Sequence, residues 1–336
     1  MRGIVRIFLL LIGLSLALLL CSCEAPRDNP LDPGATNYIG PEASVGSVKG
    51  RVTGLDYTPL MSALVLTIPG YRGAQTNSQG DYLIEDIQAG QYQIFCAPPG
   101  YAPDTLQVTV LPMMQTIADF RLDALPVFQS FQVTSHYIYQ GTEASPPEYY
   151  NIFARARLTD PDGINDIAQV TLEVEDWPDT TMSFNSDSTV GAEAFYYVNL
   201  EFTPGASLDS IKWQHFTCVA EDASNNTAST SPLTVLRFFD DYPVPLSPID
   251  RVQEFTPTPV FEWEPFGEQF YFTYEVRVYR EQSGSLSWLE SALPPSASSI
   301  VSDSLASGFY YWLLEAFDEY GNSARSAPAY FEVYLD

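Results

Sequence analysis

Residues 216–229 read FTCVAEDASNNTAS, and residues 312–325 read WLLEAFDEYGNSAR, so the second stretch repeats the pattern of the first 96 positions later. In each copy an alternating apolar stretch ends at an aspartate, a turn ending in asparagine follows, and a second stretch begins. This order is typical of a β-hairpin. A repeat of nearly 100 residues has the size of one antiparallel β-sandwich, so we expect two such domains in tandem.

Patterns around the repeat indicate the kind of sandwich. Residues 241–336 contain PVFEW at 259–263 and GFYYW at 308–312, which resemble the early Trp strand and the late aromatic strand of fibronectin type III domains. Residues 126–240 resemble an immunoglobulin-type sandwich. Pro126 and the DDYP stretch at 240–243 mark the boundaries that we expect. No stretch has the pattern of a long amphipathic helix, so the predicted fold class is all-β.

Residues 46–125 are predicted to form a third β-sandwich, placed before the repeat. Short alternating stretches are separated by turns whose glycines fit positive φ. The motifs are, in order, GRVTG at 50–54, ALV at 63–65, TNSQGDY at 76–82, IQAGQY at 87–92 and GY at 100–101. This order resembles the carboxypeptidase regulatory-like domain, a transthyretin-like sandwich. The resemblance implies a non-catalytic module, often grouped with starch-binding and other carbohydrate-binding-like folds. The chain is therefore predicted to hold three tandem β-sandwich domains.

The N-terminus has the pattern of a targeting segment. Two arginines precede an apolar run at 7–20, which is shorter than the roughly 20 residues that span a bilayer as a helix. The LCSC sequence at 20–23 resembles the lipobox of bacterial lipoproteins, with Cys23 as the lipidated residue. An ordinary secretory signal is the alternative. We expect an outer-membrane lipoprotein, on the periplasmic face or at the cell surface, with a signal peptide at 1–22 and a flexible tether at 23–45.

Charge narrows the classes of partner. Lys and Arg number 15 against 42 Asp and Glu, which gives a formal net charge of −27. Binding to nucleic acid requires clustered basic residues, and so does electrostatic attraction to an anionic membrane, so we expect neither. The lipid anchor is the expected route to the membrane. The other expected partners are a glycan or a protein of the envelope.

The sequence lacks the motifs of common catalytic sites. Its two histidines, His136 and His215, are 79 positions apart, and HExxH, GxSxG, Walker and GxGxxG motifs are absent. Cys96 and Cys218 each lie on the apolar face of an alternating stretch. They are predicted to be buried free thiols rather than disulfide partners or zinc ligands. We therefore predict no enzymatic activity and no cofactor, with calcium as the exception considered next.

Two groups of residues are candidates for binding. Asp160, Asp162 and Asp166 place three carboxylates within seven positions, which suits Ca²⁺, but the DPDG order at 160–163 also fits a simple β-turn. We favour the turn and keep calcium as the alternative. The second group is a surplus of aromatic residues, which either stack on sugars and anchor protein partners or divide between core and edge. It comprises Tyr137, Tyr139, Tyr149, Tyr150, Phe195, Tyr196, Tyr197, Phe270, Tyr271 and Phe272.

These patterns predict a non-catalytic, lipid-anchored envelope or cell-surface protein that acts as a binding, adhesion or spacer module. One alternative is a carbohydrate-binding surface lipoprotein, because of the resemblance of residues 46–125 and the aromatic surplus. The other alternative is an accessory subunit of an envelope complex. The sequence patterns do not identify the ligand or the residues that bind it.

Overall fold

The computed structural model describes Ala35 and residues 44–139, 148–185, 193–202 and 211–335. The chain divides into two compact units, Met1–Ala124 and Leu125–Asp336. In the described ranges the regular elements are β-strands apart from short 3-10 turns such as Ile164–Asp166, which confirms the all-β fold class. The expected signal peptide and Cys23 lie outside the described residues.

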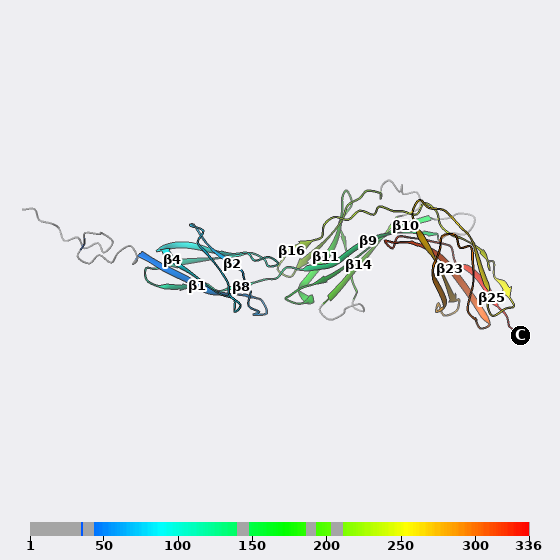
Figure 1. Cartoon of the computed structure of the whole chain (residues 1–336), viewed down its shortest axis with the longest axis horizontal. Coiled ribbons are helices and arrows are strands. Elements are labelled where there is room, and N and C mark those ends of the chain that lie inside the picture. Colours follow the sequence, from blue (N-terminus) through cyan, green and yellow to red (C-terminus); the bar gives the residue numbers. More distant parts are fainter. Residues whose placement is uncertain (1–34, 36–43, 140–147, 186–192, 203–210, 336) are drawn as a thin grey trace, which may run out of the picture. The chain divides into compact units, whose positions relative to one another are not determined.

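The first unit is a sandwich of two sheets (Figure 1). Its strands are β1 (Val45–Gly54), β2 (Leu64–Ile68), β3 (Gly73–Gln75), β4 (Asp81–Gln88), β5 (Gly90–Cys96), β6 (Asp104–Val110), β7 (Gln115–Ile117) and β8 (Phe120–Leu122). One sheet has the order β4–β1–β7 with β8 also paired to β1, and the other has the order β3–β2–β5–β6. Apolar side chains from both sheets form one core.

Strand alternation and two glycines explain this packing. In β1, Val48 and Val52 are fully buried while Lys49 between them is exposed, as expected for a strand with one face on the core. At Gly50 a Cβ atom would lie only 1.8 Å from the carbonyl oxygen of Ala118, so the backbone approach leaves no room for a side chain. Gly80 has a φ of 77° in the turn before β4, as the TNSQGDY motif predicts.

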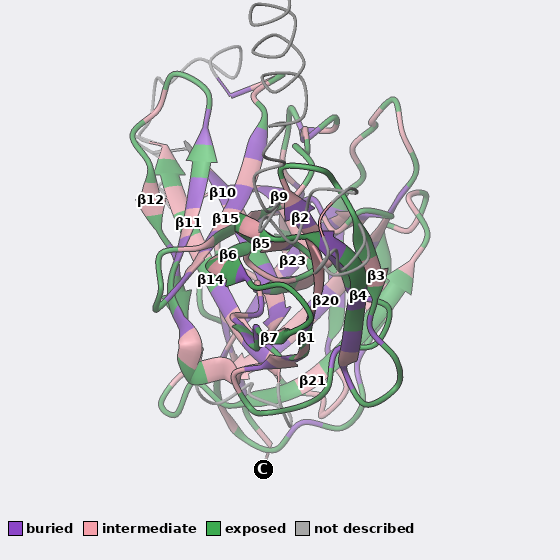
Figure 2. Cartoon of the chain, turned by 90° about the vertical axis from the view of Figure 1, so that its left-hand side faces the viewer, coloured by how far each residue is buried: buried purple, intermediate pink, exposed green. Residues whose placement is uncertain are grey.

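The described residues of the second unit form two hydrophobic cores and three sheets. Its strands are β9 (Val127–Tyr139), β10 (Glu148–Thr159), β11 (Ile167–Val174), β12 (Thr180–Thr181), β13 (Ser183–Phe184), β14 (Glu193–Phe202), β15 (Phe216–Asp222), β16 (Thr227–Ser229), β17 (Val244–Ser247), β18 (Val252–Glu254), β19 (Val260–Glu264), β20 (Phe272–Arg280), β21 (Leu286–Leu293), β22 (Ser299–Val301), β23 (Gly308–Asp318), β24 (Ser323–Arg325) and β25 (Ala329–Val333). The largest sheet follows the path β13–β14–β10–β9–β24–β23–β20–β21, with β25 paired to β23 and β18. The other sheets are β12–β11–β15–β16 and β17–β19–β22. Buried residues (purple in Figure 2) alternate with intermediate or exposed ones along strands such as β15, β19 and β20.

The sequence repeat forms the same hairpin in both cores, β15–β16 in one and β23–β24 in the other. The backbone N–H of Asp222 donates to the carbonyl oxygen of Asn226, and that of Asp318 donates to that of Asn322, both at 3.0 Å. In each turn the asparagine Nδ2 also donates to the aspartate Oδ2, at 2.9 Å in the first copy and 2.8 Å in the second. The hairpins predicted from the repeat are confirmed.

The strand β9 joins the two cores. It pairs with β10 along most of its length, and near its end Ser323–Arg325 of β24 pair with it in parallel. Phe131 and Val133 consequently pack against one core while Tyr137 lies in the other. The sandwiches expected at 126–240 and 241–336 therefore share one sheet instead of forming separate units. The boundary between them at 240 stays a prediction.

Candidate functional site

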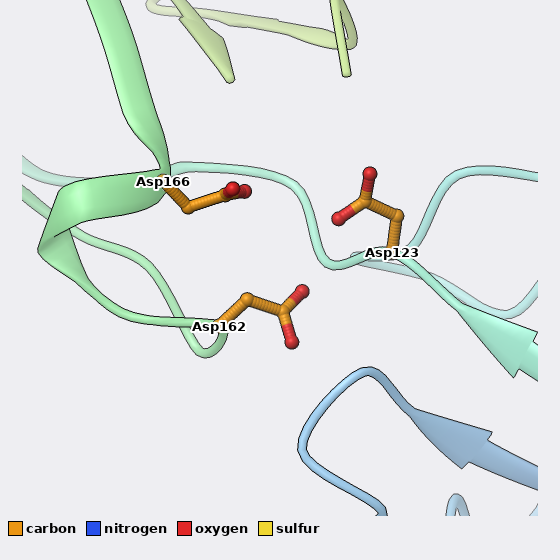
Figure 3. A group of neighbouring side chains, drawn as sticks. All are labelled: Asp123, Asp162 and Asp166. Atoms are coloured by element: carbon orange, nitrogen blue, oxygen red, sulfur yellow. The ribbon is translucent and has the colours of Figure 1, made fainter. Parts of the chain in front are cut away.

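The aspartates of the DPDG motif lie in the loop between β10 and β11. The Gly163 N–H donates to the Asp160 carbonyl oxygen at 3.0 Å, and the Asp162 N–H donates to Asp160 Oδ1 at 2.8 Å. Figure 3 shows Asp162 on this loop and Asp166 at the short helix that follows it. The hydrogen bonds are those of a β-turn closed by an aspartate side chain. Calcium binding by these residues stays a prediction.

Asp160 is the unusual member of this loop, because its residue surface is only 4 % exposed. Its Oδ2 atom is buried and has no hydrogen-bond partner among the described residues. The pKa of Asp160 is raised to about 6, mainly by burial and in addition by the nearby carboxylates of Asp166, Asp162 and Asp222, while the hydrogen bond from the Asp162 N–H lowers it. The charged form is therefore unfavourable in the native protein.

A buried polar junction lies where β9 meets the β23–β24 turn. Asn322 is 3 % exposed and Ser135 is 2 % exposed. The Ser135 N–H donates to Asn322 Oδ1 at 2.9 Å, and the Ser135 hydroxyl lies 3.3 Å from the same oxygen. That hydroxyl also donates to the Arg237 carbonyl oxygen at 3.0 Å. Asn322 thus binds its own turn through Nδ2 and β9 through Oδ1.

His136 belongs to the same junction. Its Nδ1 lies 2.9 Å from Ser323 Oγ, its Nε2 lies 2.8 Å from Thr134 Oγ1, and the Ser323 hydroxyl donates to Glu315 Oε1 at 2.8 Å. Because the Ser323 proton goes to Glu315, His136 donates from Nδ1, while the Thr134 hydroxyl lies between Nε2 and the Phe153 carbonyl oxygen. Burial lowers the pKa of His136, and the positive charges of Arg325 and Arg155 lower it further. The ring is therefore neutral at pH 7, and its role is structural, since it links Thr134 of β9 to Ser323 of β24.

The structure separates the aromatic candidates. Tyr137, Tyr196 and Phe272 are buried, and Tyr150 packs against both cores. Tyr137 stacks on Tyr150 with ring centres 4.6 Å apart. Of the remaining candidates, Tyr139, Phe195 and Phe270 are half-buried, and Tyr197 and Tyr271 are exposed. The side chain of Tyr149 lies outside the described residues. Half of the ten candidates, Tyr137, Tyr150, Tyr196, Phe270 and Phe272, therefore serve packing.

Three of the candidates, Phe195, Tyr196 and Tyr197, line a groove of about 630 Å³ on the β9–β10–β14 part of the large sheet. Phe153 and Arg155 of β10 also line it, and sequence reasoning missed both. The sequence pattern could have identified both residues. The alternation of β10 buries Ile152 and its equivalents, which places Phe153 and Arg155 on the opposite face.

The two cysteines and the remaining histidine match their predicted roles. Cys96 and Cys218 are free, fully buried thiols, as the alternation predicted. His215 lies in an exposed loop. No helix in the described part of the chain combines the length and the apolar character needed to cross a bilayer.

Comparison with known proteins supports the resemblance of the first unit. The family model of the carboxypeptidase regulatory-like domain matches residues 47–123. A search of the curated proteins finds no match.

Several solved structures resemble the chain over much of its length. The TIE protein of Bacillus anthracis has 11% identity and a TM-score of 0.28, with 87% of this chain and 51% of that chain covered. This chain thus spans about half of that protein. The major pilin subunit BcpA of Bacillus cereus has 10% identity and a TM-score of 0.31, with 87% and 98% covered. A DUF3823 family protein from Parabacteroides merdae has 14% identity and a TM-score of 0.24, with 58% and 100% covered. Similarity at this level carries no inference about function.

Proposed function

We propose that the chain is a non-catalytic, lipid-anchored protein of the bacterial envelope, in which the second unit is a stiff binding or adhesion module. One observation carries the proposal: β9 joins two sandwich cores into one sheet, and Ser135 and Asn322 form buried hydrogen bonds at the junction. Rotating one sandwich against the other would break these bonds and expose buried polar groups. Such a unit holds a surface at a fixed position, which suits display and adhesion.

The anchor is inferred from the LCSC sequence at 20–23, with Cys23 as the modified residue. Several acyl chains, at about 0.8 kcal/mol per buried CH₂ group, hold a protein at a membrane essentially permanently. The test is the intact mass of the membrane-extracted protein. We expect a mature chain that begins at Cys23 and carries lipid.

Two variants make this test specific. Cys23→Ala is expected to abolish the lipid mass, whereas Cys21→Ala is expected to preserve it because Cys21 leaves with the signal peptide. A soluble, unmodified wild-type chain would contradict the proposal. Protease treatment of whole cells then separates the two settings. Digestion supports display at the surface, and protection supports the alternative of an accessory subunit in a periplasmic complex.

A further inference from the structure

The outer face of β9, β10 and β14 carries a regular arrangement of cationic, amide and aromatic side chains. Arg155 of β10 is directly opposite Gln132 on β9 and Tyr197 on β14. Residues paired across the strands form rows on this face. Phe153 lies in the row next to that of Arg155 on one side, and Phe195 lies in the next row on the other side. Rows on one face of a sheet are about 7 Å apart. Three aromatic side chains therefore lie in or next to the row of Arg155, and Arg157 lies in the row of Phe195.

These side chains line the groove of about 630 Å³ described above. No Asp or Glu is among its lining residues, although the chain carries 42 of them and a net charge of −27. Arg155 is exposed and donates from Nε and Nη2 to Gln132 Oε1, at 3.0 and 2.5 Å. Among the described residues it has no carboxylate partner within 4 Å, so its Nη1 protons and one Nη2 proton are solvated and available to a ligand. Arg157, the second arginine that lines the groove, is paired with Glu193 at 3.5 Å.

The lining suits a sugar better than a peptide. Aromatic rings bind the C–H face of a pyranose, and guanidinium groups bind carboxylates through two parallel hydrogen bonds. An extended peptide binds at the edge of a sheet, where backbone groups are unpaired. This groove lies on a face instead, since β10 is paired on both sides, to β9 and to β14. Only side chains are available for contact there.

We propose that this groove binds an acidic oligosaccharide, with sugar rings on Phe153, Phe195 and Tyr197 and a uronate carboxylate on Arg155. The inference rests on the proposed function, because it supplies the ligand of the binding module. Gln132 acts as a positioning residue: it orients Arg155 through Oε1 and is itself fixed by the bond from its Nε2 to the Tyr320 carbonyl oxygen, at 3.1 Å.

The test is calorimetric titration of the full chain, extracted in detergent, with hexagalacturonate. Maltohexaose tests whether the carboxylate is required, and hexaglutamate tests whether the sugar is required. We expect hexagalacturonate to bind at least tenfold more tightly than either. Arg155→Gln is expected to weaken it at least tenfold, and Tyr197→Ala is expected to weaken it as well, because each removes one kind of contact.

Two matched variants outside the groove serve as controls. Arg251→Gln and Tyr271→Ala alter an exposed arginine and an exposed tyrosine, and both are expected to keep the wild-type affinity. Thermal midpoints of all variants show that they are folded. Equal binding of maltohexaose or hexaglutamate, or an Arg155→Gln variant with wild-type affinity, would overturn the inference. The intact mass of the same sample tests the lipid anchor independently of ligand binding. A chain that carries lipid but does not bind hexagalacturonate contradicts the proposed ligand of the groove and leaves the proposed function unaffected.

Discussion

The bond between Asn322 and β9 gives the sharpest test of how the two sandwiches are held together. Asn322→Ala removes the hydrogen bond from its Nδ2 to Asp318 Oδ2 and the bonds that its Oδ1 accepts from the Ser135 N–H and hydroxyl. Of these groups, the hydroxyl keeps the Arg237 carbonyl oxygen as an acceptor. Both Asp318 and Ser135 lie in the buried junction, where water cannot replace the amide. The substitution therefore leaves a buried N–H donor unpaired and removes one donor from a buried carboxylate.

The expected loss follows from these two defects. A buried polar group left without its partner costs about 1–3 kcal/mol, so we expect Asn322→Ala to lower the free energy of unfolding of the second unit by about 3 kcal/mol. For a unit of about 200 residues, each kcal/mol lowers the melting temperature by about 2–4 °C. The melting temperature should therefore fall by about 6–12 °C.

Tryptophan fluorescence during urea or thermal unfolding measures this loss without interference from the first unit, because all five tryptophans lie in residues 125–336. Asn226→Ala is the matched control. It removes the equivalent bond to Asp222 from the turn of the other copy, where the asparagine is only half-buried. We expect this control to cost about 1 kcal/mol.

The comparison of the two variants decides the question. If Asn322→Ala and Asn226→Ala agree within about 0.5 kcal/mol, the bond from Ser135 adds nothing, and the junction is not what holds the sandwiches together. A wild-type unit that unfolds in two separate fluorescence transitions would also contradict a shared, cooperative sheet.

Three further outcomes follow from burial and backbone geometry. Because the pKa of Asp160 is raised to about 6, native Asp160 binds a proton that the unfolded chain has lost, so stability should fall as the pH rises from about 4 through 6. Asp160→Asn should remove that fall and raise the free energy of unfolding, measured with urea at pH 8, by about 1–3 kcal/mol. If Ca²⁺ at pH 8 stabilises the wild type but not this variant, the calcium alternative is favoured. Burial raises the pKa of Cys96 to about 11 and that of Cys218 to about 12, so a thiol reagent at pH 8 should label neither until urea unfolds the chain, and labelling of the native protein would contradict their burial. Gly50→Ala should abolish protection from hydrogen exchange in the first unit and leave the tryptophan transition unchanged, because the new Cβ would collide with the Ala118 carbonyl oxygen; retained protection would show that β1 can move away.

Local patterns made most of the fold predictable. The hairpins at Asp222 and Asp318 depend on residues within five positions of each other, and the alternation around them fixes which side chains enter the core. Cys218 illustrates this, since its place in an alternating strand predicts complete burial. The aspartate loop was predictable as a turn for the same reason, because Asp160 and Gly163 are three positions apart.

The junction was not predictable by the same means. Ser135 and Asn322 are 187 positions apart, and nothing in the pattern of either stretch indicates that they meet. The polar residues 134–136 even interrupt the apolar pattern of β9 that a core strand should show. They are polar because β9 passes there from one core to the other, so the hydrogen bonds of the junction replace apolar packing.

The same sheet that joins the sandwiches also positions the groove. Gln132 donates through Nε2 to Tyr320 in the β23–β24 turn and accepts from Arg155 through Oε1. One amide thus links the turn that Asn322 holds to the guanidinium that lines the groove. If the sandwiches were separate, Gln132 would lose the Tyr320 acceptor and would hold Arg155 less firmly, since an exposed arginine loses its orientation when its neighbours move. The shared sheet therefore helps to fix the orientation of Arg155 on a face of this strongly acidic protein.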